Sequence, residues 1–278
     1  MGATWNGVRS PDHGWCTTEA DMPIGDRRRV AATLALAAIP VLTPAVLAPA
    51  APAEARPFPA RSPGDYTVFG PDTSRHNHRN GLPFDWEEVV RSGQSFAIMK
   101  ATQGTRYVDP WFARDIAGAR RVGLIHGAYH YFTADAPGRA QADHFLRVLR
   151  RNGFTGTRAH QLPAEVDVEQ CYANGRRLRL SEVTAFLNRI REVTGRHATL
   201  YTRKSFIDEC LGGTTSLGRY RLHLARYGKA SPEPVAGGRA WSFWQYTRRS
   251  YVPGIGFPTD HNVYHGTLSS LRRLANLR

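Results

Sequence analysis

Three acidic side chains stand at every second position of the stretch LPAEVDVEQ, residues 162–170. Glu165, Asp167 and Glu169 alternate there with apolar residues. Successive side chains of a β-strand point to opposite faces, so a strand places all three carboxylates on one face. Burying that much like charge is costly unless a site uses it. The spacing therefore predicts a strand whose acidic face has a chemical role.

Two carboxylates that flank a bond are the groups that glycoside hydrolysis requires. One donates a proton to the leaving oxygen, and the other stabilises or attacks the positively charged sugar. The backbones of Asp167 and Glu169 lie about 6.5–7 Å apart in a strand. The separation of their flexible carboxyl groups stays open, so the spacing does not choose between retention and inversion. A D-x-E pair alone is weak evidence, because exposed strands carry such pairs on solvated faces.

Eight strand-like runs are available to position these acids. The first runs alternate with helical segments, and after residue 196 the helical pattern is lost until one last helix. Helices are predicted at 109–123, 138–153, 180–195 and 267–276. The strand-like runs are 65–70, 95–102, 124–132, 162–169, 198–202, 220–227, 241–247 and 261–266.

This order of elements predicts an α/β barrel of the TIM type, with parallel strands early and fewer helices late. Chemistry in such barrels lies at the carboxyl ends of the strands. Asp72 follows the first predicted strand, Asp167 and Glu169 close the fourth, and Asp260 stands at the start of the eighth. The four carboxylates then converge on one mouth. A doubly wound sheet is the alternative fold, and it would scatter them.

Aromatic and amide side chains near the predicted strand ends are candidates for sugar binding. Aromatic rings could stack on sugars, although core packing is the competing explanation. Gln245 and Asn262 could hydrogen-bond sugar hydroxyl or acetamido groups, and Lys100 joins the binding candidates. The aromatic candidates are Tyr129, Tyr131, Phe132, Tyr201, Tyr227, Trp244 and Tyr246.

The first 55 residues are typical of a secretory leader rather than of the fold. Three arginines at 27–29 precede an apolar Ala/Leu-rich run and an A-x-A ending at 53–55, so we expect cleavage after Ala55. Residues 1–21 are an unusual extension, and a start at Met22 explains them. Pro40 and Pro44 disfavour the alternative of an uncleaved membrane anchor. Residues 56–67 then form a lead-in segment, and 68–278 form the barrel domain.

Composition indicates a basic exported protein. The leader holds 4 of the 37 Lys/Arg and 5 of the 23 Asp/Glu, which leaves a charge of +15 on residues 56–278. Such a charge favours an anionic cell-wall polymer as partner. No dense basic run or nucleic-acid module accompanies it, so nucleic acid is the weaker interpretation.

Cys171 and Cys210 remain as a pair after the leader is removed, and in an exported protein they predict a disulfide. Closing that loop contributes about 4 kcal/mol in the chain-entropy model. Two free buried thiols are the alternative. No metal-ligand spacing is found: His126 and His130 are four residues apart, too far in a strand to chelate one ion.

From Gly70 to about Leu274 the chain resembles the family 25 glycoside hydrolases, the Chalaropsis-type lysozymes. Seven blocks match in order: GPDTSRHN…FDW (70–86), FAIMKATQGTRYVDPWF (96–112), GLIHGAYHYF (123–132), LPAEVDVE (162–169), TLYT (199–202), WSFWQYT (241–247) and VPGIGFPTDHNVYHG (252–266). The resemblance implies a modified barrel of five β/α units followed by three strands with little helix. It also implies cleavage of the β-1,4 bond between N-acetylmuramic acid and N-acetylglucosamine in peptidoglycan.

The resemblance also implies roles for the acids. Glu169 would be the general acid, and Asp72, Asp167 and Asp260 would complete the acidic cluster. No metal or organic cofactor is implied, and we expect a monomer. Two residues depart from the family: Glu165 stands at a usually apolar position, and His223 stands where Trp is frequent. We expect Glu165 to pair with Lys100 or another interior base.

Two other functions stay open. A chitinase-like hydrolase would also use acids on a fourth strand, but the longer D-x-x-D-x-D-x-E pattern is absent. A non-catalytic wall-binding barrel is the second, although binding alone does not require four costly acids. The sequence therefore favours a secreted lysozyme.

Overall fold

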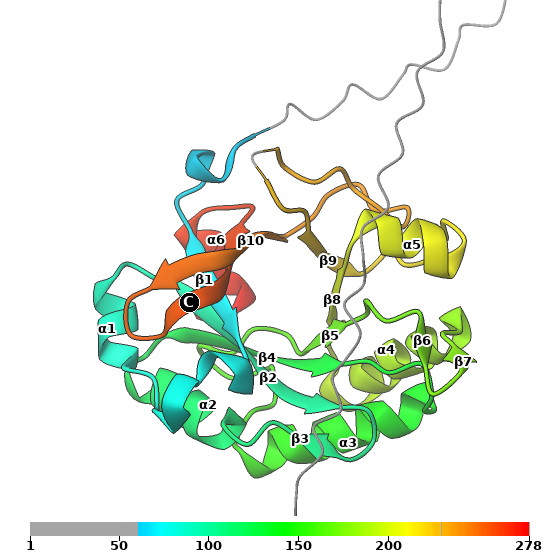
Figure 1. Cartoon of the computed structure of the whole chain (residues 1–278), viewed down its shortest axis with the longest axis horizontal. Coiled ribbons are helices and arrows are strands. Elements are labelled where there is room, and N and C mark those ends of the chain that lie inside the picture. The colour runs from blue at the N-terminus through cyan, green and yellow to red at the C-terminus, as the bar shows by residue number, and fades with distance from the viewer. Residues whose placement is uncertain (1–60, 229, 278) are drawn as a thin grey trace, which may run out of the picture. The chain divides into compact units, whose positions relative to one another are not determined.

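Eight strands close into one barrel in the computed structural model, which describes residues 61–228 and 230–277. Figure 1 shows the ring of strands with helices packed along its outer side. Around the barrel the strands follow the order β1-β11-β10-β9-β8-β5-β4-β2, and β1 pairs with β2 to close it. They are β1 (Phe69–Thr73), β2 (Phe96–Gln103), β4 (Ile125–Tyr131), β5 (Glu165–Asp167), β8 (Thr199–Thr202), β9 (Arg221–Ala225), β10 (Phe243–Val252) and β11 (Gly256–Tyr264).

All neighbouring barrel strands are parallel except at β11, which runs antiparallel to both β10 and β1. Two small antiparallel additions lie outside the ring. β3 (Tyr107–Val108) extends β2, and β6 (Tyr172–Ala173) forms a hairpin with β7 (Arg176–Arg177). The barrel is therefore parallel over most of its circumference, as predicted.

Helices follow the first five barrel strands in turn, and β9, β10 and β11 follow without helices between them. This confirms the expected five β/α units and three final strands. The helices are α1 (Trp86–Arg91), α2 (Phe112–Arg121), α3 (Gly138–Arg151), α4 (Leu180–Thr194), α5 (Lys204–Leu211) and α6 (Leu268–Leu274). Three 3-10 turns lie at Pro63–Asp65, Arg75–Asn77 and Arg79–Gly81.

The prediction that helical pattern is lost after residue 196 is wrong for α5, and α1 was missed. α5 has eight residues and buries Phe206, Ile207 and Cys210. Three apolar positions are too few to show the 3.6-residue period of a helix in the sequence. α1 has six residues and depends on the Asp85 side chain, which accepts a hydrogen bond from Glu88 N at 2.9 Å. Short helices stabilised by caps and tertiary contacts leave little periodic signal.

The observed strand bounds also correct the predicted positions of two acids relative to their strands. The 3-10 turn at Pro63–Asp65 delays the first strand, so Asp72 lies within β1 rather than after it. β11 begins at Gly256, so Asp260 lies in its middle rather than at its start. Asp72 and Asp260 are consequently opposite each other across the β1–β11 ladder.

The apolar face of the acidic strand packs outward against the helices. Val166 and Val168 belong to one hydrophobic cluster with Phe145 of α3 and Phe186 of α4. A second cluster joins Phe96, Ile98 and Phe243 of the barrel to Leu271 and Leu274 of α6. With the apolar side chains outside, the alternate positions of β5 are left to face the barrel interior.

The predicted leader, residues 1–55, lies outside the described residues, as does the start of the lead-in segment. Within that segment Tyr66 packs against the barrel, with its ring centroid 5.6 Å from that of Trp241. In the described part of the chain, no helix has the length and apolar character needed to span a membrane.

Candidate active site

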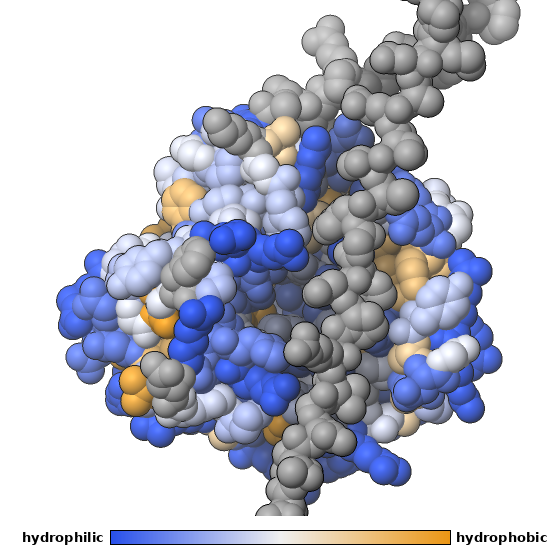
Figure 2. All heavy atoms as spheres, in the orientation of Figure 1, coloured by the Kyte–Doolittle hydropathy of each residue, from blue (hydrophilic) through white to orange (hydrophobic). Residues whose placement is uncertain are grey.

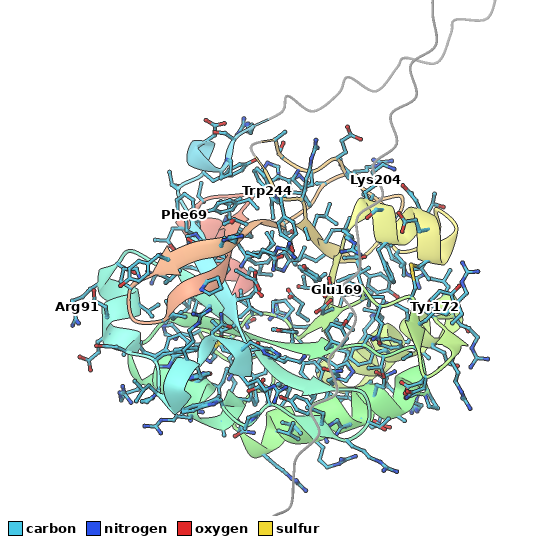
Figure 3. All side chains as sticks on the ribbon, in the orientation of Figure 1. Phe69, Arg91, Glu169, Tyr172, Lys204 and Trp244 are labelled. Carbon is cyan, nitrogen blue, oxygen red and sulfur yellow. A yellow bond between two sulfur atoms is a disulfide. The ribbon has the colours of Figure 1, made fainter. Side chains whose placement is uncertain are left out.

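The four predicted acids line one cavity of about 290 Å³. Asp72 and Asp260 come from β1 and β11, Asp167 is the last residue of β5, and Glu169 follows two residues later. Figure 3 shows Glu169 on the inner side of the ring near β5 and β8, and in Figure 2 hydrophilic side chains gather on the left side of the molecule's centre, where no grey atoms cover it. The other lining residues are Ser74, His76, Lys100, Tyr129, Tyr131, Glu165, Tyr201, Tyr227, Gln245 and Arg248.

A larger depression of about 850 Å³ lies along α6, but its composition is unsuited to acid–base chemistry. Its lining is Leu268, Ser269, Arg272, Arg273, Asn276 and Leu277. Because no carboxylate lies among these residues, we take the acidic cavity as the candidate site.

Glu165 and Asp167 of β5 line the same cavity as Glu169, as predicted, but the strand ends at Asp167, so Glu169 follows the strand rather than closing it. Glu165 and Asp167 are buried, and Glu169 is partly exposed beyond the strand end. Asp167 pairs in register with Tyr131 of β4 and Tyr201 of β8. Its Oδ1 atom is buried without a hydrogen-bond partner among the described residues. An unpartnered buried oxygen facing a cavity is suited to contact a ligand.

Burial and mutual repulsion keep protons on the β5 carboxyls. Burial raises the pKa of Asp167 well above its usual value, and the nearby Glu169 raises it further. Burial also raises the pKa of Glu169, as does Asp72, while Arg203 opposes the shift. Two crowded carboxyls cannot both ionise easily, so at least one of them holds a proton near neutral pH. A proton donor and a carboxylate are thus available together.

Asp72 is held by two amides from neighbouring strands. Its Oδ2 atom accepts hydrogen bonds from Gln245 Nε2 and from Asn262 Nδ2, each at 2.9 Å. Asp260 faces Asp72 across the β1–β11 ladder, and burial and the charges of Asp72 and Glu169 raise the pKa of Asp260 to about 8. Asp260 is therefore largely protonated at neutral pH.

Tyrosine side chains form much of the remaining wall. Tyr201 and Tyr227 both donate their hydroxyl hydrogens to Gln245 Oε1, at 3.0 and 2.9 Å. Burial raises the pKa of Tyr227 to about 12, so its ring stays neutral at physiological pH. Tyr129 and Tyr131 also line the cavity, as predicted. These rings offer sugar-sized faces beside the acids.

Four predicted binding residues lie outside the cavity lining. Phe132 and Trp244 are buried in the hydrophobic core, where Trp244 Nε1 donates to the Arg226 carbonyl oxygen at 2.7 Å. They pack between strands and helices, so the prediction that they stack on sugar is corrected. Asn262 is fully buried behind Asp72 and contacts that carboxylate instead of the cavity. The Tyr246 hydroxyl is hydrogen-bonded to His261 Nδ1 at 2.7 Å, and Tyr246 does not line the cavity.

The partner of Glu165 is His223, an interior base, and not Lys100. His223 Nδ1 lies 3.1 and 3.2 Å from the two Glu165 carboxyl oxygens. Lys100 lines the cavity, donates to Gln103 Oε1 at 2.9 Å, and places its Nζ 4.6 Å from the Tyr131 ring centroid. Lys100 therefore remains a candidate for ligand contact.

Ser74, His76 and Arg248 line the cavity but were not predicted. The first two lie in the segment SRHNH (74–78), which begins two residues after Asp72. Its position after a strand that carries an acid was the available signal. Arg248 was inconspicuous in an arginine-rich chain, yet its guanidinium carbon lies 5.5 Å from the Tyr227 ring centroid.

The predicted disulfide is present between Cys171 and Cys210, whose Cα atoms are 5.4 Å apart. It joins the segment just after Glu169 to α5. Among the described residues, no group of three or more His, Cys, Asp or Glu side chains is arranged to hold a metal ion.

Residues 72–255 match the family model described as glycosyl hydrolases family 25. That range spans three of the four acids and most of the barrel.

The chain belongs to glycosyl hydrolase family 25.

Relatives and solved structures agree with this membership. The chain is 33% identical over 220 residues to the uncharacterized protein YegX of Escherichia coli strain K12, covering 77% of this chain and 76% of YegX. It is 29% identical over 195 residues to N,O-diacetylmuramidase of Chalaropsis sp, covering 66% and 89%. The crystal structure of the lysozyme from Streptomyces coelicolor matches with a TM-score of 0.67 and 31% identity, covering 75% and 97%. This family 25 chain is therefore a glycoside hydrolase of the lysozyme and muramidase group.

Proposed function

We propose that this family 25 hydrolase is a secreted muramidase that cleaves the β-1,4 bond between N-acetylmuramic acid and N-acetylglucosamine in peptidoglycan. One observation carries the proposal: four carboxylates from β1, β5 and β11 line a single cavity walled by tyrosines. Similarity to a Chalaropsis protein named as a diacetylmuramidase supports the choice of bond.

Glu169 is the general acid in this proposal. It lies at the partly exposed rim of the cavity, where burial and the charge of Asp72 raise its pKa and so favour its protonated form. Glu169 donates that proton to the glycosidic oxygen as the bond from this oxygen to the sugar carbon breaks. A water molecule then completes hydrolysis and returns a proton to the Glu169 carboxylate.

Asp167 stabilises the positive charge that develops on the sugar in this proposal. It is the deeper of the two carboxyls, and its free Oδ1 can contact the sugar ring or its acetamido group. Asp72 adds negative charge to the cavity, and protonated Asp260 can donate a hydrogen bond to a sugar oxygen. Lys100, Tyr129, Tyr131, Tyr201, Tyr227 and Gln245 are the proposed sugar-binding residues, all of them in the cavity wall.

The deciding experiment is digestion of purified peptidoglycan by the full chain, followed by borohydride reduction and mass spectrometry. Reduced muramic acid ends are expected, because cleavage on the muramic acid side leaves that sugar with the reducing end. Reduced glucosamine ends would retain the hydrolase but overturn the bond assignment. Binding to peptidoglycan without release of fragments would favour a non-catalytic wall-binding barrel.

Secretion is proposed from the leader-like residues 1–55 and from the disulfide, which is typical of oxidising compartments. Expression of the full chain in a secreting bacterial host should yield an extracellular product that starts at Arg56. Intact-mass measurement of that product tests the cleavage position. A cell-retained product that keeps residues 22–55 would support the membrane-anchor alternative instead.

A further inference from the structure

A line of hydrogen-bonded polar side chains runs through the barrel interior behind the proposed site. Glu165 contacts His223 Nδ1 at 3.1 Å, and His223 Nε2 lies 2.8 Å from Asn262 Oδ1. Asn262 Nδ2 in turn donates to Asp72 Oδ2 at 2.9 Å. The four residues come from β5, β9, β11 and β1, so the line crosses the barrel. His223 and Asn262 are fully buried and take no part in the proposed reaction steps.

The hydrogen-bond partners determine which way the Asn262 amide points. Its Nδ2 atom lies 3.0 Å from the Gly70 carbonyl oxygen, which can only accept, and 2.9 Å from the Asp72 carboxyl. This end of the amide is therefore the nitrogen, and the opposite oxygen requires a donor. His223 Nε2–H is that donor. A flipped amide would place NH₂ against an N–H group and an oxygen against a carboxylate.

The contact of Glu165 with His223 Nδ1 keeps a hydrogen on His223 Nε2, which donates it to the Asn262 amide oxygen. Whether the shared proton lies on Nδ1 or on Glu165, the Nδ1 contact is satisfied and Nε2 retains its hydrogen. Burial lowers the pKa of His223, but the charge of Glu165 and its hydrogen bond outweigh burial and raise that pKa. The Tyr201 ring lies perpendicular to the imidazole with centroids 5.0 Å apart, and Phe243 packs at 5.5 Å. The ring is thus restricted in position.

We infer that His223, held by Glu165, is a positioning residue that fixes the Asn262 amide as a hydrogen-bond donor to Asp72. The inference deepens the proposed function and rests on it, since it concerns how the Asp72 carboxyl is held in that site. Stability alone does not explain the pair, because replacing a buried ion pair by apolar residues is often neutral or stabilising.

Loss of the Asn262 donor removes one of the two amide hydrogen bonds that hold the Asp72 carboxyl, the other coming from Gln245 Nε2. The Asp72 carboxyl would then be less restricted in its position in the cavity wall. A misplaced side chain in the site should lower kcat more than it raises KM.

Two matched variants of the full chain separate positioning from structure. In H223Q the amide nitrogen can take the place of Nε2 and donate to Asn262, whereas the shorter side chain in H223N reaches only the Glu165 side. Both variants remove the imidazole, but H223Q keeps a donor for Asn262 whereas H223N keeps one for Glu165. We expect kcat/KM on peptidoglycan within about threefold of wild type for H223Q and reduced at least about tenfold for H223N, mainly through kcat.

Equal losses of kcat/KM in both variants would overturn the inference and leave the pair a purely structural role. N262L provides a second measurement if H223N fails to fold, because it removes the donor to Asp72 while the contact between Glu165 and His223 Nδ1 remains. It should reproduce the loss of kcat, and a wild-type kcat would overturn the inference as well. Wild-type enzyme in the same assay tests the proposed function separately. Nitrogen-15 NMR of His223 gives a further readout, since Nε2 should stay protonated from pH 5 to 8.

Discussion

At the residue scale, the β5 carboxyls act as a pair because they share a buried location. Asp167 and Glu169 repel each other when both are ionised, and burial adds to the cost. Proton retention therefore follows from position and not from residue type. The same two residue types on an exposed strand would both ionise well below neutral pH.

Replacing Glu169 by Gln should abolish proton donation while preserving side-chain volume. General acid catalysis contributes about 10²–10⁴-fold, so kcat on peptidoglycan should fall by at least about a hundredfold. The fold should survive, because removing a buried carboxyl charge relieves repulsion with Asp167. Turbidity loss of wall suspensions measures the rate, and thermal unfolding measures the fold.

E87Q is the matched control, since Glu87 is exposed on α1. It should retain wild-type activity. Lysis by E169Q at the wild-type rate would remove Glu169 from its proposed role.

Asp260 should make folding stability fall as pH rises. Its folded pKa, about 8, lies above that of an unfolded aspartate, so the folded state binds the proton more tightly. Its contribution is fully present below pH ~4 and is lost as pH rises through about 8, with a slope of at most about 1.4 kcal/mol per pH unit.

Urea unfolding of wild type and D260N between pH 5 and 8 measures this effect. D260N has no proton to lose and should show a shallower decline in unfolding free energy. D208N, at an exposed position on α5, should keep the wild-type slope. If the unfolding free energies of wild type and D260N changed equally with pH, the raised pKa of Asp260 would be contradicted.

At the element scale, the closure of the barrel positions Asp72. β1 joins β2 on one side and β11 on the other, and both contacts are close. A Cβ atom at Gly70 would lie 2.2 Å from the Phe96 carbonyl oxygen, a backbone atom that cannot rotate away. Glycine at this position is therefore required by the approach of β1 to β2.

G70A should destabilise the protein by about 1–3 kcal/mol through overpacking and should also reduce activity, because Asp72 lies two residues further along β1. G64A is the matched control, since its Cβ would meet only Ser62 Oγ at an ordinary 3.7 Å. Urea unfolding and kcat measured on both variants test this. Wild-type stability in G70A would show that β1 and β2 can separate without cost.

At the scale of the whole molecule, net charge governs adhesion rather than catalysis. The chain carries a formal charge of +14 at pH 7. Attraction between such a protein and an anionic wall polymer is screened by salt, whose Debye length falls from about 10 Å at 0.1 M to about 3 Å at 1 M. Surface charge and the buried site should therefore respond differently to ionic strength.

Binding of E169Q to insoluble wall should weaken several-fold between about 0.1 and 1 M NaCl. The inactive variant is used so that cleavage does not release the protein. Sedimentation of the wall with bound protein measures the fraction retained. Chitin, a neutral polymer, is the control and should show little salt dependence. Salt-independent binding to the wall would assign adhesion to the cavity instead.

Features of this protein that depend on local geometry could be predicted from the order of its residues. Alternation in LPAEVDVEQ placed Glu165, Asp167 and Glu169 on one face, because side chains of any strand alternate. The order of strands and helices predicted the barrel, and the barrel gathered Asp72 and Asp260 at the same cavity.

The contacts that those residues make could not be predicted in this way, because they depend on how the chain folds. Phe132 and Trp244 stand beside cavity residues in the sequence yet pack into the core, and Glu165 pairs with His223, 58 positions away. Asp72 faces Asp260 because the antiparallel β11 closes the barrel, a pairing between distant segments. The physical reason is range: alternation follows from adjacent peptide units, whereas burial, pKa and hydrogen-bond partners depend on distant strands brought together by folding.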